Sequence, residues 1–145
     1  MRYINKDDIV AIIHERLINE SVAMDTAIPL ADNDIIIDIE SKAIDLVISY
    51  ISRRYNHVEI FSDTPIRNGV LVQLISSIVV YRAVKRNAAR KVPDDYVELY
   101  KEAIKTLEKI QAGAMDLIGC PLLINFDGSP VSPLWGNSTN DNNFV

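Results

Sequence analysis

The sequence has few of the residues on which catalytic and metal sites are usually built. Among its 145 residues are one cysteine, two histidines and five glycines. A single cysteine excludes an internal disulfide and a cysteine-rich zinc site. The glycines form no phosphate-binding loop, and neither a nucleophile motif nor a paired-histidine metal motif occurs. We therefore predict no catalytic residue, no cofactor and no metal site.

Long apolar runs are also missing. The most apolar stretch, residues 69–83, is interrupted by Gln73, Ser76, Ser77 and Arg82. It is shorter than the roughly 20 residues that a membrane-spanning helix needs. The first residues lack the apolar core that is typical of a secretion signal. We expect a soluble protein without a membrane partner.

Positive charge is scarce overall but concentrated in the middle of the chain. The formal net charge is -5 at pH 7. Residues 1–41 carry nine acids and three bases (net -6), residues 42–91 three acids and nine bases (net +6), and residues 92–145 eight acids and three bases (net -5). An acidic chain repels phosphates, so direct nucleic-acid binding is not expected. The basic middle either neutralises its flanks within one fold or faces an acidic surface of another copy.

The chain does contain a series of amphipathic helical patterns. Apolar spacing predicts four helices, over residues 6–19, 38–55, 65–89 and 93–112. Asn5 and Asp38 are suitable N-caps, and Pro65 and Pro93 suit the first helical position. The third helix is apolar around most of its circumference, so we expect it to be central, with the stripe of the fourth helix packed on it. Gly113 is a suitable C-cap for the fourth helix.

The remaining segments are predicted to be irregular. Residues 20–37 contain Pro29 and the polar cluster 32–34, and they are predicted to form a loop. Ile35, Ile36 and Ile37 are β-branched and favour a short extended segment. The acids near residue 32 lack the central glycine of a calcium loop, and a turn followed by an N-cap accounts for them.

The predicted fold class is all-α. We expect a small bundle of about four helices over residues 1–113 and an extended C-terminal arm over residues 114–145, with short β segments in the irregular parts. The arm is rich in proline and asparagine but also carries large apolar side chains, which usually need a surface to cover them. The candidate partner-binding residues of the arm are Leu122, Leu123, Ile124, Phe126, Trp135 and Phe144.

Two destinations for the arm remain open. Its aromatic residues either fold back on their own domain as a strap or dock on another chain, where they are the expected hot spots of an interface. As a further hypothesis, Leu122–Phe126 pairs as a strand with Ile35–Ile37 of its own or a neighbouring copy.

A basic run closes the third predicted helix. Positive charge at a helix C-terminus interacts favourably with the macrodipole, so a structural explanation is sufficient. Contact with a partner's acidic patch, or with phosphate or DNA, is the alternative. Arg82, Arg86 and Arg90 are therefore candidate partner-binding residues. A cysteine-dependent enzyme is a further alternative, and it would require Cys120 to meet one of the two histidines.

Several short motifs, taken in order, resemble a known family. They are Met1-Arg2-Tyr3-Ile4 with Asp7-Asp8-Ile9, Ala43-Ile44-Asp45 running into Tyr50-Ile51-Ser52-Arg53-Arg54-Tyr55, the stretch from Pro65 to Tyr81, and Tyr100, Ala103, Leu107, Ile110 and Gly113. In this combination the chain resembles the head–tail connector (adaptor) proteins of Mu-like phages and prophages. The comparison covers most of residues 1–113 and leaves out the arm from Cys120 onward.

The resemblance implies a structural role. Such proteins are helical subunits that form a homo-oligomeric ring beneath the portal and join the capsid to the tail. The expected partners are further copies of the chain and the portal, neck and tail proteins. The expected location is the virion, and the bacterial host cytoplasm during assembly. The resemblance implies no catalytic residues. The alternative role is a helical DNA-binding or regulatory protein of a prophage.

Overall fold

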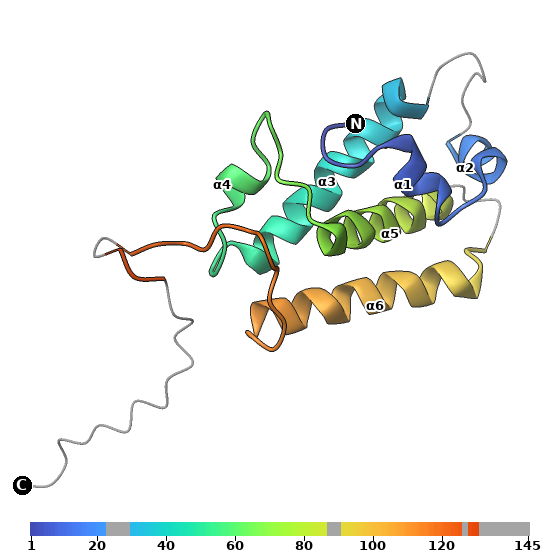
Figure 1. Ribbon diagram of the computed structural model, residues 1–145. Coiled ribbons are helices and arrows are strands. Elements are labelled where there is room, and N and C mark those ends of the chain that lie inside the picture. The colour runs from blue at the N-terminus through green and yellow to red at the C-terminus, as the bar shows by residue number, and fades with distance from the viewer. Residues whose placement is uncertain (23–29, 87–90, 126–127, 131–145) are drawn as a thin grey trace, which may run out of the picture.

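The computed structural model describes residues 1–22, 30–86, 91–125 and 128–130 (Figure 1). These residues contain six α-helices, one short 3-10 helix and no β-strand, which confirms the all-α prediction. The elements are α1 (Lys6–Val10), α2 (Glu15–Ser21), η1 (Leu30–Asp32), α3 (Asp34–Ile51), α4 (His57–Ile60), α5 (Gly69–Arg86) and α6 (Asp94–Gln111). None of these helices is long and apolar enough to cross a membrane.

Helix α5 is the centre of the bundle, as its sequence predicts. It lies between α3 and α6, and α1 and α2 also contact it (Figure 1). Its residues Leu71, Ile75 and Ile78 are fully buried. The stripe of α6 packs on α5, and Tyr81 stacks on Tyr100 with ring centroids 4.3 Å apart. The predicted C-cap of α6 is wrong by one residue: Ala112 is the C-cap, and Gly113 follows it with a φ of 79° that favours glycine.

The single helix predicted over residues 6–19 is wrong, because the chain breaks it into α1 and α2. His14 has extended backbone angles, and its Nδ1 accepts a hydrogen bond from the N–H of Arg16, so it starts a new helix. The predicted cap of the first helix is confirmed. Asn5 and Asp8 form a reciprocal capping box at the start of α1.

The extended segment predicted at Ile35–Ile37 is also wrong. The side chain of Asn33 accepts hydrogen bonds from the N–H groups of Ile35 and Ile36, at 2.9 and 3.3 Å, and so starts α3 four residues before the predicted cap, Asp38. Tertiary packing overrides β propensity here, because Ile36 is fully buried against the core.

Helix α5 begins at Gly69 rather than at the predicted Pro65. The side chain of Asn68 accepts hydrogen bonds from the N–H groups of Val70 and Leu71, and so provides the cap. Residues 65–68 are instead used as a connection, in which the carbonyl of Ile66 and the N–H of Asn68 bind the Tyr3 hydroxyl.

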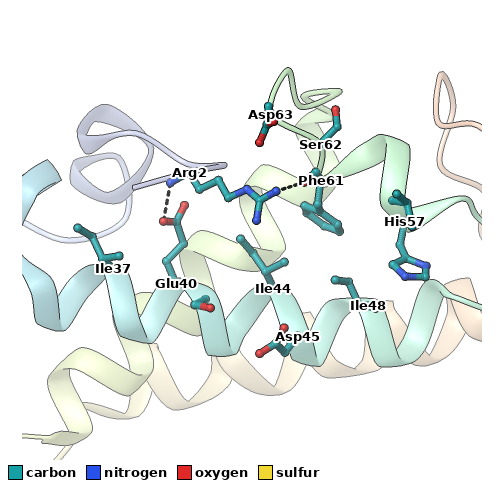
Figure 2. Close-up of a pocket in the computed structure, with 12 residues that line it drawn as sticks. Arg2, Ile37, Glu40, Ile44, Asp45, Ile48, His57, Phe61, Ser62 and Asp63 are labelled. Carbon is teal, nitrogen blue, oxygen red and sulfur yellow. Dashed lines mark hydrogen bonds between the residues drawn. The ribbon is translucent and has the colours of Figure 1, made fainter.

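A buried carboxylate holds the N-terminal segment on α3. The side chain of Glu40 is almost wholly buried and accepts hydrogen bonds from the N–H groups of Arg2, Tyr3 and Ile4, at 2.7, 2.8 and 2.9 Å. The guanidinium of Arg2 in turn donates to the carbonyl of Phe61 at 2.6 Å (Figure 2). The N-terminal segment therefore connects α3 to the chain after α4.

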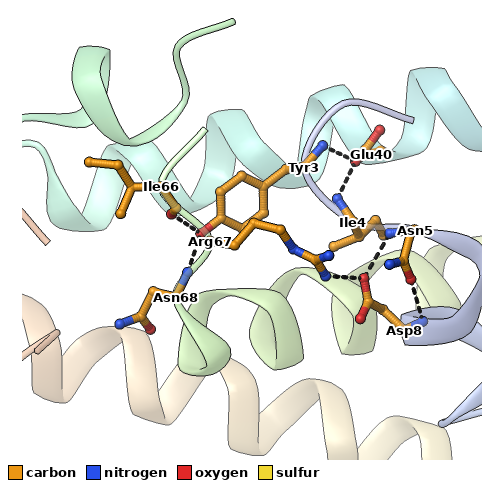
Figure 3. A network of polar contacts seen from close by, with 8 residues as sticks. All are labelled: Tyr3, Ile4, Asn5, Asp8, Glu40, Ile66, Arg67 and Asn68. Atoms are coloured by element: carbon orange, nitrogen blue, oxygen red, sulfur yellow. Dashed lines mark hydrogen bonds and ion pairs between the residues drawn. The ribbon is translucent and has the colours of Figure 1, made fainter. Parts of the chain in front are cut away.

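The same segment is tied to the start of α5. The Tyr3 hydroxyl donates to the Ile66 carbonyl and accepts from the Asn68 N–H, at 2.9 and 3.1 Å, and burial raises the pKa of this hydroxyl (Figure 3). Arg67 pairs with Asp8 of α1 at 2.6 Å. Polar contacts thus fix the N-terminal segment against three helices.

We expect Glu40→Ala to lower the free energy of unfolding by about 3 kcal/mol, because three backbone donors lose their acceptor in a buried place. Urea denaturation followed by far-UV circular dichroism measures this change. The matched control is Asp45→Ala, an exposed acid on the same helix, which is expected to change stability by less than about 0.5 kcal/mol. Equal stability of the two variants would contradict the anchoring role of Glu40.

Candidate functional site

The candidate enzyme residues line separate surfaces of the described fold. His14 caps α2, His57 lines a groove between α3 and α4, and Cys120 lines a different groove beside the arm. Burial raises the pKa of the Cys120 thiol, which keeps it protonated at neutral pH. Within the described ranges, no cluster of three or more His, Cys, Asp or Glu side chains is placed to hold a metal ion.

The beginning of the arm is fastened to its own domain. Leu122 forms an antiparallel bridge with Tyr55, and the flanking hydrogen bonds join the Asn56 N–H to the Pro121 carbonyl and the Leu123 N–H to the Arg54 carbonyl, each at 2.9 Å. The hypothesis that this segment pairs with Ile35–Ile37 of its own chain is therefore wrong, since those residues belong to α3. We use "arm root" for residues 117–130.

Arg54 and Tyr55, in the turn that follows α3, bind the end of α6 and the arm root through their side chains. The Tyr55 hydroxyl accepts a hydrogen bond from the Leu117 N–H at 2.8 Å, in a buried environment. The Arg54 guanidinium donates to the carbonyl of Ile110, at 2.7 Å, and pairs with Asp116 at 2.6 Å. The C-terminal turn of α6 and the arm root are consequently fixed to α3.

Two of the apolar side chains predicted to bind a partner, Leu122 and Ile124, are exposed. Leu122 is 43% exposed and Ile124 is 68% exposed, and alternation along an extended segment puts them on one face. Leu123 is only partly exposed. The chain then turns back, with a bridge between Ile124 and Pro130. The candidate residues Phe126, Trp135, Phe144 and Arg90 lie outside the described residues.

The basic end of α5 is partly used by the fold. Arg82 and Arg86 line a shallow groove together with Asp34, Asp38 and Lys42 of α3. Arg86 also donates to the carbonyl of Val22 at 3.4 Å. Acidic residues of the range 1–41 thus lie beside basic residues of the range 42–91. Part of the charge difference between these two ranges is therefore neutralised within one chain. A mixed-charge groove of this kind is a weak phosphate-binding surface.

Sequence reasoning missed a second groove, between α3 and α4. Its volume is about 550 Å³ (Figure 2). Its apolar lining is contributed by Ile37, Ile44, Ile48, Val58 and Phe61. Val58 is 69% exposed although it belongs to a helix. No sequence pattern indicates this groove. Helix α4 is too short to show a helical periodicity, and the β-branched run at Ile35–Ile37 predicts an extended segment rather than a helix face.

Polar groups surround this apolar lining. Arg2 is held at one side by Glu40 and by the carbonyl of Phe61. The carboxylates of Asp45 and Asp63 stand at the rim, and in the described part of the chain neither has a hydrogen-bond or ion-pair partner. The buried Nδ1 atom of His57 also has no partner there. The groove can therefore bind an apolar side chain and, beside it, hydrogen-bond donors.

The comparisons with known proteins concern the helical part of the chain and the start of the arm. A family model described as Bacteriophage Mu, Gp36 matches residues 3–120, which is most of the sequence. No curated protein matches the chain. The matched range includes Glu40, Arg54 and Tyr55, and it ends where the arm root meets the end of α3.

We expect Arg54→Ala to lower the free energy of unfolding by about 2 kcal/mol, because the Ile110 carbonyl and Asp116 lose a partly buried charged donor. Arg53→Ala is the matched control, since this neighbouring arginine is exposed and should be neutral within about 0.5 kcal/mol. Denaturation in urea compares the two. Faster amide hydrogen exchange at Leu117 in the Arg54 variant alone is the second expected result, and unchanged exchange there would argue against a role of Arg54 in holding the arm root.

Proposed function

The chain belongs to the bacteriophage Mu Gp36 family, and from this membership we propose that it is a structural head–tail connector (adaptor) subunit of a tailed phage or prophage. It forms a ring of identical copies beneath the portal and joins the capsid to the tail. Its partners are further copies and the portal, neck and tail proteins. It acts in the virion, after assembly in the bacterial host cytoplasm, and it performs no catalysis.

The observation that carries this proposal is the combination of a tightly fastened helical domain with uncovered apolar side chains at its arm root. Leu122 and Ile124 are exposed on a segment whose backbone is fixed by hydrogen bonds to Arg54 and Asn56. Exposed apolar side chains on a fixed backbone favour binding, because little conformational entropy is lost when a partner covers them. An assembly protein needs such preorganised surfaces.

The proposed mechanism is geometric. A surface that binds a different surface of the next copy makes a heterologous contact, and such contacts close into a ring when the rotation between copies divides a full turn. The rigid attachment of the arm root to α3 keeps that rotation constant. Acidic and basic side chains of α3 and α5 lie side by side and partly neutralise each other. Apolar contacts would therefore supply most of the affinity between copies.

We expect the purified chain to form closed rings at high protein concentration, visible by negative-stain electron microscopy. In a phage that encodes the chain, loss of its gene should leave DNA-filled heads and separate tails, because no ring joins them. Restoring the gene in trans is the control. Normal joined particles without the gene would disprove the connector role. A purified chain that remains monomeric at every concentration would disprove ring formation by the chain alone.

A further inference from the structure

The groove between α3 and α4 is not explained by the packing of the domain. A concave, largely apolar surface of about 550 Å³ stays open beside the well-packed core of the described helices. At its edges Val58 is 69% exposed and Ile37 is 39% exposed. Such a pocket with a few polar groups around it is the usual form of a binding site for a side chain of a partner.

The polar groups of the groove restrict what can occupy it. The carboxylates of Asp45 and Asp63 only accept hydrogen bonds, and among the described residues nothing donates to them. Both carboxylates are exposed, so they remain solvated while the groove is empty. The groove therefore suits an occupant that is apolar at its centre and brings no further acid close to these carboxylates, and N–H or O–H donors beside the apolar part would find acceptors at the rim.

We propose that the groove of one copy binds residues 131–145 of the next copy, with Leu134 and Trp135 inserted between α3 and α4. This inference rests on the proposed function, which supplies the neighbouring copy. Residues 131–140 of the segment meet the requirements of the groove, and the acid of the segment, Asp141, lies six residues beyond Trp135. Residues 131–140 contain no charged side chain, and the indole of Trp135 combines a large apolar surface with one N–H donor. Asn137 and Asn140 supply amide donors on the same stretch.

The position at which the described arm ends favours a neighbouring copy as the owner of the groove. Helix α4 separates two surfaces, of which His57 and Val58 line the α3–α4 groove whereas Asn56 and Glu59 line the groove of the arm root. Pro130 belongs to the second surface, and Figure 1 shows residues 123–125 leading away from the helices. The described arm thus ends beside the surface of α4 that does not line the groove, which favours the groove of a neighbouring copy.

Trp135 is the only tryptophan of the chain, so its fluorescence reports directly on this docking. We expect emission typical of a water-exposed indole in dilute, monomeric protein and a shift to shorter wavelength as copies associate. Val58→Asp should weaken association about thirtyfold or more, since a charge replaces an apolar contact of the inserted indole. Val58 is exposed in the monomer, so the variant should remain folded, which circular dichroism verifies.

The matched control is Leu17→Asp. Leu17 is also an exposed apolar residue, 43% accessible, but it belongs to α2 and lines neither surface of α4. This variant should associate and shift its emission as the unaltered chain does. Trp135→Ala should weaken association as much as Val58→Asp, and combining the two changes should add little, because they remove the same contact.

The outcomes separate this inference from the connector role. Short-wavelength emission in the dilute monomer would mean that the segment covers its own domain, and it would overturn the inference. Rings that form equally well with Val58→Asp, or rings with a water-exposed Trp135, would also overturn it while leaving the connector role intact. An unaltered chain that stays monomeric at every concentration, with its emission unchanged, would overturn the inference and ring formation by the chain alone, and the connector role would then be decided by the particles that form without the gene.

Discussion

The carboxylate of Glu40 accepts hydrogen bonds from three consecutive backbone N–H groups, those of Arg2, Tyr3 and Ile4. A charged acceptor that is buried this deeply is tolerated only because several donors converge on it. Its effect extends beyond its own contacts. Once the backbone of the first residues is fixed, the guanidinium of Arg2 reaches the Phe61 carbonyl and the hydroxyl of Tyr3 reaches the cap of α5. The loop after α4, which forms one wall of the groove, therefore depends on a residue in the middle of α3.

The other end of α3 has a corresponding role for the C-terminal part. Arg54 and Tyr55 bind the last turn of α6 and the arm root through side-chain donors and acceptors, and the Leu122 bridge adds a backbone pairing. Asn68, the cap of α5, also donates to the Ile118 carbonyl at 2.8 Å, so the two polar systems meet at the start of α5. Both terminal segments are thus positioned by α3, and α4 lies between the places where they are fastened.

The parts of this fold that the sequence predicts are those with long, regular periodicity. Helices α5 and α6 extend over five turns each, and their apolar spacing identified both the central helix and the stripe that covers it. The errors occur where one polar side chain decides the local conformation. Asn33 caps α3 in place of the predicted Asp38, and Asn68 caps α5 after the predicted start at Pro65. Asn68 also binds its tertiary surroundings, since its amide donates to the Ile118 carbonyl.

For the same reason, the sequence predicts only one part of the candidate site, the apolar residues of the arm, and not the groove. The apolar residues of the arm stand out against proline and asparagine, whereas the groove arises from residues on three separate segments that only the fold brings together. Its position has a consequence for assembly. In the proposed arrangement the arm leaves on one side of α4 and the α3–α4 groove opens on the other side. Each copy would then bind the arm of one neighbour in its groove and place its own arm in the groove of another neighbour. This is a heterologous interface, for which a fixed rotation between neighbours determines whether the assembly closes. In the proposed ring, the hydrogen bonds that fasten the arm root and the N-terminal segment to the two ends of α3 would keep that rotation the same in every copy.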